Sequence, residues 1–500
     1  MTAGVVASPH RLASEAGARI LKDGGNAIDA AIAANAVLCV VYPHMTSIGG
    51  DLMAIVWPAG AQSPVGLVGA GRAGELASIA AVRERGYEEM PLRGALPVTV
   101  PGTVEAWGRL LERFGTFGLG AVLEPAVAAA HDGYVITPQL SANLMVASEF
   151  LAREPEAYAL YPPMEAGMLL RNPQLATVLR DIGRRGIGGF YRGDLAAAIA
   201  KTIQRRDGFV TAKDLANHHS QWVEPVAFAY RGVTIYELPP PTQGLAAAAM
   251  LVRLGALRVD ELQPGPAFIA PFRKARDESY ALRDRYITDP EFAAIPAGEF
   301  LTPGRTVAPR GSIRDAGDTV YLCAADEHGN VVSLIQSLAF DFGSGVVAEG
   351  TGVLLHDRGC YFSLDPAHVN RLEAKKRTMH TLIPAMAARD GRPWAAFGTM
   401  GGDGQPQLQA QVLMNLVDGG LAPDEAVARP RIRILAGGEK TSIEADYPGA
   451  GGLARSDASI HLMPAKHHQF GHAQALVIDG PRAWRAGADP RSDGSVEFAG

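Results

Sequence analysis

Gly317-Asp318-Thr319-Val320-Tyr321 stands where the character of this 500-residue sequence changes. Before it, residues 290–317, called the connector below, are rich in Pro, Gly, Arg and Thr without a sustained period, so we expect an exposed connecting segment. After it, two apolar, strand-like runs (319–325 and 331–337) flank the turn-forming residues 326–330 and predict a β-hairpin. Helical patterns dominate before the connector and strand patterns follow it.

Hydrophobic periodicity predicts the remaining elements. We expect helices over residues 12–22, 27–42, 103–114, 121–131, 195–204, 244–257, 272–286 and 405–417, and strands over 52–57, 65–68, 352–355 and 394–397. The most apolar of these, residues 27–42, contains Asp29 and Asn35. It is too short and too polar to cross a membrane, so it is expected to be a buried helix capped by Asn26.

Composition narrows the class of protein. Apolar residues make up 47% of the chain and charged residues 20%, which excludes a disordered or collagen-like polymer. The 46 Lys and Arg residues against 52 Asp and Glu residues give a net charge of −6, which provides no reason to expect nucleic acid or anionic membrane as a partner. Three cysteines cannot form a disulfide framework. Residues 1–8 lack the pattern of a secretory signal, and we expect a cytoplasmic enzyme.

Two apparent ligand motifs are weak. Residues 69–74 match G-x-G-x-x-G, but no parallel strand is predicted at the distance that a dinucleotide-binding unit requires. His467, His468 and His472 lack a carboxylate or cysteine at ligand spacing, so a surface loop is favoured over a metal site. We expect neither a metal nor a cofactor.

Thr319 offers a different chemistry. A threonine hydroxyl is a poor nucleophile unless a base lies beside it, and cleavage of the preceding peptide bond would create that base as a free α-amine. A threonine at the start of a strand is also explained by β-propensity alone. The residues themselves leave both readings open.

Several separate motifs, in order along nearly the whole chain, resemble the γ-glutamyltransferase (γ-glutamyltranspeptidase) family of N-terminal nucleophile hydrolases. They are residues 24–31 (GGNAIDAA), 43–51 (PHMTSIGGD), 100–104 (VPGTV), 317–319 (GDT), 342–345 (FGSG), 401–402 (GG) and 489–494 (DPRSDG).

The resemblance implies an α+β fold, a four-layer αββα sandwich, made as a precursor that cleaves itself between Asp318 and Thr319. Residues 1–318 would form the large chain, ending in the connector, and residues 319–500 the small chain that carries the nucleophile. The two chains would remain partners in one compact unit.

The same resemblance implies a role for individual residues. Thr319 would attack the substrate carbonyl and form an acyl-enzyme, and Ser337 would orient it. Gly401 and Gly402 would supply the backbone N–H groups of an oxyanion hole. Arg72 would bind a substrate carboxylate through its planar fork.

This sequence departs from the family where substrates with an α-ammonium are held. Tyr361 and Ala339 stand where an acid and an asparagine are expected, and His380 and Thr381 replace a pair of serines that helps bind the carboxylate. Val320 replaces a second threonine. The pattern looks more like the family's acylase and amidohydrolase branches. We therefore expect a hydrolase or acyltransferase that attacks an amide or related carbonyl of a small carboxylate-bearing substrate, and expect glutathione to be a poor substrate.

Three alternatives remain from the sequence. The enzyme could resemble the family's branch that breaks a carbon–carbon bond in the synthesis of proline-derived antibiotics. The chain could be an uncleaved, non-catalytic relative that binds a small carboxylate, or a nucleotide-dependent oxidoreductase that uses residues 69–74.

Overall fold

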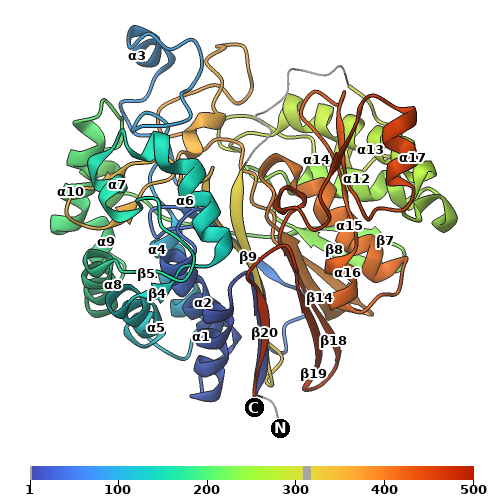
Figure 1. Cartoon of the computed structure of the whole chain (residues 1–500), viewed down its shortest axis with the longest axis horizontal. Coiled ribbons are helices and arrows are strands. Elements are labelled where there is room, and N and C mark those ends of the chain that lie inside the picture. The colour runs from blue at the N-terminus through green and yellow to red at the C-terminus, as the bar shows by residue number, and fades with distance from the viewer. Residues whose placement is uncertain (1–2, 308–316) are drawn as a thin grey trace.

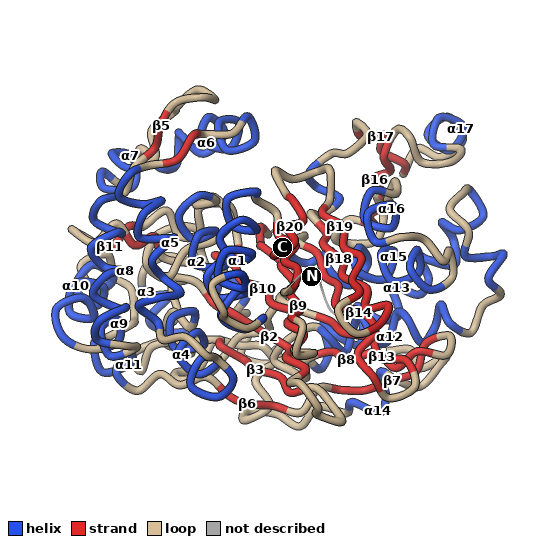
Figure 2. Tube along the Cα trace, turned by 90° about the horizontal axis from the view of Figure 1, so that it is seen from below, coloured by secondary structure: helices blue, strands red, loops and turns tan. Residues whose placement is uncertain are grey.

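Two large antiparallel sheets pack face to face, and helices cover the outer face of each (Figure 1; Figure 2). The structure is a computed structural model that describes residues 3–307 and 317–500. The N- and C-terminal strands pair with each other, so the two ends of the chain lie side by side. The predicted four-layer αββα sandwich is confirmed.

The first sheet has the strand order β20-β1-β9-β10-β2-β3-β6. Its strands are β1 (Gly4–Ser8), β2 (Asp51–Trp57), β3 (Val65–Gly69), β6 (Gln221–Val223), β9 (Asp318–Asp326), β10 (Val331–Ala339) and β20 (Ser495–Ala499). The hairpin β9–β10 is the predicted one, and it lies in the middle of the sheet.

The second sheet has the order β19-β18-β14-β13-β8-β7. Its strands are β7 (Val226–Tyr230), β8 (Val233–Glu237), β13 (Ala385–Arg389), β14 (Arg392–Thr399), β18 (Ala473–Gly480) and β19 (Ala483–Ala488). Short strands outside the two sheets are β4 (Tyr134–Val135), β5 (Leu169–Leu170), β11 (Val347–Ala348), β12 (Val353–Leu354), β15 (Ile432–Ile434), β16 (Thr441–Glu444) and β17 (Ile460–Met463).

The helices divide between the two sheets (Figure 1). On the side of the first sheet lie α1 (Arg11–Lys22), α2 (Ala27–Val41), α3 (Ile79–Glu84), α4 (Thr103–Phe114), α5 (Leu119–Asp132), α6 (Pro138–Leu151), α7 (Pro155–Leu160), α8 (Pro173–Arg185), α9 (Gly188–Tyr191), α10 (Gly193–Gln204) and α11 (Ala212–Ala216). On the side of the second lie α12 (Gly244–Gly255), α13 (Pro266–Tyr286), α14 (Ala297–Phe300), α15 (Gln405–Val417), α16 (Pro423–Ala428) and α17 (Ala450–Ser456).

Alternation along the central strands builds the layers, because successive side chains of a strand point to opposite faces. In β9, Val320, Leu322 and Ala324 pack under the helices of the first sheet. Tyr321 and Cys323 pack between the two sheets. Thr319 shares the parity of this second set, so the pleat directs its side chain toward the second sheet.

Most predicted elements are present, and α4 and α15 have the predicted bounds. The emphasis on helices before the connector was incomplete, because that segment also contributes β1 to β8. Both large sheets therefore combine strands from before and after residue 318. The described part of the connector is mostly exposed, as expected, but it contains α14, whose Phe300 is buried. Residues 308–316 of the connector lie outside the described residues.

Candidate active site

Thr319 lies at the junction of the two sheet systems. It is the second residue of the central strand β9 and is buried. Its hydroxyl accepts a hydrogen bond of 3.4 Å from the side-chain amide of Gln405, the first residue of α15. The nucleophile predicted from the sequence therefore lies beside the helix that follows the predicted oxyanion residues.

Ser337 contacts the peptide bond predicted to be cut. Its Oγ donates a hydrogen bond of 2.6 Å to the carbonyl oxygen of Asp318 and accepts one of 2.7 Å from the backbone N–H of Ala339. The register between β9 and β10 shifts after Gln336, which is the mark of a bulge that redirects a side chain. The hydroxyl can thus stabilise negative charge on this carbonyl oxygen.

Arg358 ties Ser337 to Thr381. One guanidinium nitrogen lies 3.3 Å from Ser337 Oγ and the other 3.0 Å from Thr381 Oγ1. Arg358 is buried, so its charge acts in a poorly hydrated place and polarises both hydroxyls. Nothing in the sequence pointed to this residue, because a lone arginine after a turn carries no local signal.

Gly401 and Gly402 form the turn before α15. Their φ angles are +139° and +52°, a region that favours glycine. A Cβ on Gly317 would lie 2.8 Å from Gly402 Cα and 3.4 Å from the hydroxyl of Tyr361. It would also lie 3.0 Å from the carbonyl oxygen of Ala339. The end of the connector therefore fills the space between three positions predicted to meet substrate.

The glycine turn is held from behind by polar side chains that the sequence analysis did not find. Gln243 donates to the carbonyl oxygens of Gly402 (3.0 Å) and Thr381 (3.1 Å). Arg283 donates at 2.6 Å to Asp403, and both side chains are about 1% exposed. This support fixes the turn before any substrate arrives.

His380 is part of a buried network next to the site. Its Nε2 lies 3.1 Å from Asp51 Oδ2, and its Nδ1 accepts from the backbone N–H of Leu382. Burial lowers the pKa of His380 to about 4, and Arg358 adds to this, so the ring is neutral near pH 7. With both ring nitrogens engaged, its contacts are structural in the uncut chain; its predicted role in substrate binding stays a prediction.

Arg72 follows Gly71, whose backbone N–H donates to Asp51, the residue that His380 contacts. It forms ion pairs with Asp289 at 3.2 Å and with Glu291, and it lines a cavity of about 400 Å³. Within residues 3–307 and 317–500, no hydrogen bond or ion pair joins Arg72 to Thr319 or Ser337. Its predicted role as the carboxylate clamp stays a prediction.

The glycines at 69–74 serve packing against the chain's own backbone. A Cβ on Gly71 would lie 1.5 Å from the carbonyl oxygen of Val100, and one on Gly74 would lie 2.2 Å from that of Phe209. The strand that leads into them, β3, pairs antiparallel with both neighbours. This arrangement leaves no room for a pyrophosphate and contradicts the dinucleotide reading.

The structure also shows where His472 of the histidine motif lies. His472 is buried and lies within 3.5 Å of Tyr42, in contrast to the expected surface loop. Among the residues the structure describes, no group of three or more His, Cys, Asp or Glu side chains is placed to hold a metal ion. In the same part of the chain, no helix has the length and apolar character needed to cross a bilayer.

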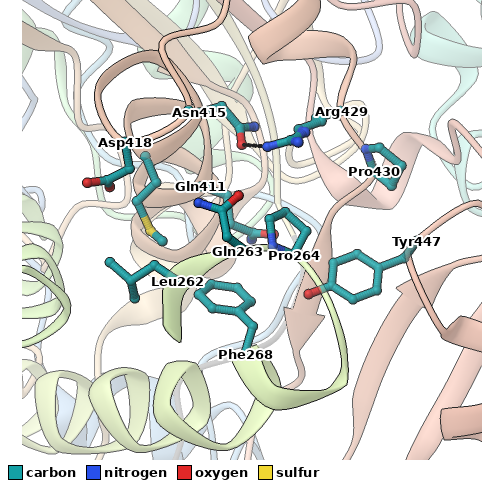
Figure 3. A pocket seen from close by; sticks show the side chains of 12 residues that line it. Leu262, Gln263, Pro264, Phe268, Gln411, Asn415, Asp418, Arg429, Pro430 and Tyr447 are labelled. Carbon is teal, nitrogen blue, oxygen red and sulfur yellow. Dashed lines mark hydrogen bonds between the residues drawn. The ribbon is translucent and has the colours of Figure 1, made fainter. Parts of the chain in front are cut away.

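A further hollow, shown in Figure 3, lies between α13 and α15, and Phe268 and Asn415 are among the residues that line it. Its volume is about 20 Å³, which is room for one water molecule. The nucleophile is not among its lining residues. This hollow is too small for a substrate.

Several known proteins are similar to this chain over nearly its whole length. The glutathione hydrolase-like YwrD proenzyme of Bacillus subtilis is 36% identical, over 99% of this chain and 98% of that protein. The oxamate amidohydrolase proenzyme of Klebsiella pneumoniae is 33% identical over the same shares. The crystal structure of cephalosporin acylase from Bacillus halodurans superposes with a TM-score of 0.91 at 35% identity, covering 99% of this chain and 96% of that one.

These relatives are a proenzyme of a glutathione hydrolase-like protein, a proenzyme of an amidohydrolase and an acylase, and each is similar over nearly its whole length. The family model described as gamma-glutamyltranspeptidase matches residues 13–499. The chain belongs to the gamma-glutamyltranspeptidase family and is an enzyme with the fold of the N-terminal nucleophile hydrolases.

Proposed function

We propose that the chain cleaves itself between Asp318 and Thr319 and then hydrolyses an amide of a small carboxylate-bearing acid through Thr319. The observation that carries this proposal is the hydrogen bond of 2.6 Å from the Ser337 hydroxyl to the carbonyl oxygen of Asp318. The buried Ser337 hydroxyl contacts Arg358, which polarises it, and it points at the carbonyl oxygen of the peptide bond before Thr319. It can therefore stabilise the negative charge that forms on this oxygen when the bond is attacked.

In the self-cleavage step, Thr319 Oγ1 attacks the Asp318 carbonyl carbon, and Ser337 stabilises the charge that develops on its oxygen. The C–N bond breaks, the nitrogen of Thr319 takes the proton lost by the hydroxyl, and an ester joins the two residues. Water hydrolyses that ester, which leaves a carboxylate on Asp318 and restores the hydroxyl of Thr319. The product is a free α-amine beside its own nucleophile.

In substrate turnover, that α-amine accepts the proton of Thr319 Oγ1 as the oxygen attacks the substrate carbonyl. The backbone N–H groups of Gly401 and Gly402 would face the developing oxyanion, reinforced by the N-terminus of α15. The amine of the substrate leaves with a proton, and water then hydrolyses the acyl-enzyme.

The choice of an amide other than glutathione rests on the side chains around Gly317. Tyr361 and Ala339 lie there, and neither carries a negative charge for an α-ammonium. The similarity to an oxamate amidohydrolase proenzyme and to a cephalosporin acylase supports the same choice. We therefore propose that γ-glutamyl amides are poor substrates.

The test is a denaturing gel with intact masses for the wild type, Thr319→Ala and a control, Thr351→Ala. Thr351 is also buried, but its hydroxyl bonds the carbonyl of Ala348 in the turn between β11 and β12. We expect two fragments, residues 1–318 and 319–500, from the wild type and the control, and one full-length band from Thr319→Ala. A single band from all three, after prolonged incubation, would overturn the proposal.

A further inference from the structure

We propose that Asp318 occupies, in the uncut chain, the subsite that a substrate's acyl group fills after cleavage, and that Arg93 binds the acyl carboxylate there. The preferred substrates would then be amides of succinic-type acids. This inference rests on the proposed function, because it requires Thr319 to be the nucleophile of both reactions.

Self-cleavage and substrate turnover would use the same nucleophile, Thr319. In self-cleavage Thr319 attacks the carbonyl of Asp318, whose oxygen is held by Ser337 and whose preceding residue, Gly317, packs against Gly402. A substrate whose carbonyl is attacked by the same oxygen atom, in the orientation of the scissile peptide bond, would place its acyl chain where Asp318 lies. Asp318 thus acts as an internal substrate.

Arg93 provides a positive charge beyond the end of β10. Arg93 Nη1 donates to the carbonyl oxygens of Asp341 and Gly343, just beyond Ala339, which is the residue paired with Asp318 in the sheet. Its guanidinium carbon lies 4.0 Å from the centre of the Phe150 ring. These contacts leave Nε and Nη2 without a hydrogen-bond partner among the described residues. The remaining N–H groups can receive a carboxylate.

The carboxyl groups of Asp318, Asp341 and Asp357 interact electrostatically with Arg93. Burial raises the pKa of Asp318 to about 6, and Arg93 is the strongest opposing influence. Asp357, 3.9 Å from Arg93, has its pKa raised to about 6 by burial, and that of Asp341 is also raised. When the connector leaves, water enters, the burial of Asp318 is relieved, and the attraction of Arg93 remains for an incoming carboxylate.

The length of the acyl chain determines where its carboxylate lies. In an aspartyl residue, two carbons separate the carbonyl carbon from the side-chain carboxyl carbon, which is the spacing of a succinyl group. Malonyl and glutaryl groups place the carboxylate one carbon nearer or farther. A fixed guanidinium, held by two backbone carbonyls and an aromatic ring, distinguishes such positions better than a flexible one.

One experiment measures self-cleavage in freshly synthesised precursor, for Asp318→Asn, Arg93→Met and the double variant. If Arg93 acts on the Asp318 carboxylate, each single change slows cleavage, and the double variant is no slower than the slower single one. Independent effects that multiply would overturn the inference. Arg113→Met is the control, because Arg113 also stacks on aromatic rings, those of Phe114 and Trp222, on another part of the molecule.

The second experiment uses the cleaved enzyme and four 4-nitroanilides: malonyl, succinyl, glutaryl and the uncharged butyryl. We expect kcat/KM to be highest for succinyl and at least about tenfold above butyryl, since only the acyl carboxylate can form a charge-assisted contact with Arg93. Arg93→Met should lower kcat/KM for succinyl more than for butyryl and so reduce the ratio between them, and Arg93→Lys should restore part of that ratio.

Three results would overturn the inference. They are an absence of preference for the succinyl substrate, an equal loss of kcat/KM for succinyl and butyryl in Arg93→Met, and a succinyl preference that Arg72→Met removes but Arg93→Met does not. Hydrolysis of none of the four by the cleaved chain would overturn it as well. Failure of the proposed function is seen separately, as a wild-type chain that never cleaves itself.

Discussion

Replacing Ser337 by alanine tests the preparation of the scissile bond most directly. The change removes the donor that lies 2.6 Å from the Asp318 carbonyl oxygen. Loss of one oxyanion donor slows reactions of this kind by about 10²–10³, or about 2.7–4 kcal/mol of barrier. It also takes an acceptor from the N–H groups of Ala339 and Arg358, which costs about 1–3 kcal/mol of folding stability. We therefore expect a folded but slowly cleaving precursor.

The assay follows the fraction of uncut chain on a gel after synthesis, with a thermal melt of each protein. Ser333→Ala is the matched control: Ser333 is buried on the same strand and bonds the hydroxyl of Tyr321 at 2.8 Å, away from the cleavage site. It should lose similar stability and cleave at the wild-type rate. Wild-type cleavage in Ser337→Ala, or equal slowing in both variants, would refute the reasoning.

Three further predictions follow from the surroundings of the site. Gly401→Ala should abolish amide hydrolysis, because a side chain disfavours the φ of +139° that directs the backbone N–H proposed for the oxyanion hole. The strain should lower the folding stability by about 1–3 kcal/mol and leave the chain folded; anilide turnover and a thermal melt check these two effects. Arg283→Met should lower the free energy of unfolding by about 3–5 kcal/mol, because it removes the buried counter-charge of Asp403; denaturant titration measures it, and a change below 1 kcal/mol would contradict it. Burial lowers the pKa of His380 to about 4 and of His472 to about 3, so the unfolded chain binds more protons below pH 6.5 and stability should fall between pH 6.5 and 4; equal denaturation midpoints at pH 7.5 and 5 would count against this.

Elements with a strong local pattern were predictable. The helix over residues 103–114 and the one over 405–417 follow from apolar spacing and from the glycines beside them. The hairpin of β9 and β10 follows from two apolar runs and a turn between them. Such signals depend on neighbours in the chain, so they survive in the fold.

Elements whose identity depends on distant partners were missed. The strand β1 has only five residues, and it becomes a strand because β9 and β20 flank it. The strands β7 and β8 likewise belong to a sheet completed by β13 and β14, which come more than a hundred residues later. A short run carries too little periodicity to announce such pairing.

The amino-acid sequence alone determined the family, the four-layer fold, the place of Thr319 and the glycine turn, because these are written in contiguous motifs. Only the tertiary structure showed that Arg358 contacts Ser337, that Gln243 and Arg283 brace the turn, and that Arg93 contacts the chain just beyond Ala339, the residue paired with Asp318. The physical reason is that electrostatic and hydrogen-bonding roles depend on distance and burial. Side chains far apart in the chain acquire both only when the layers pack.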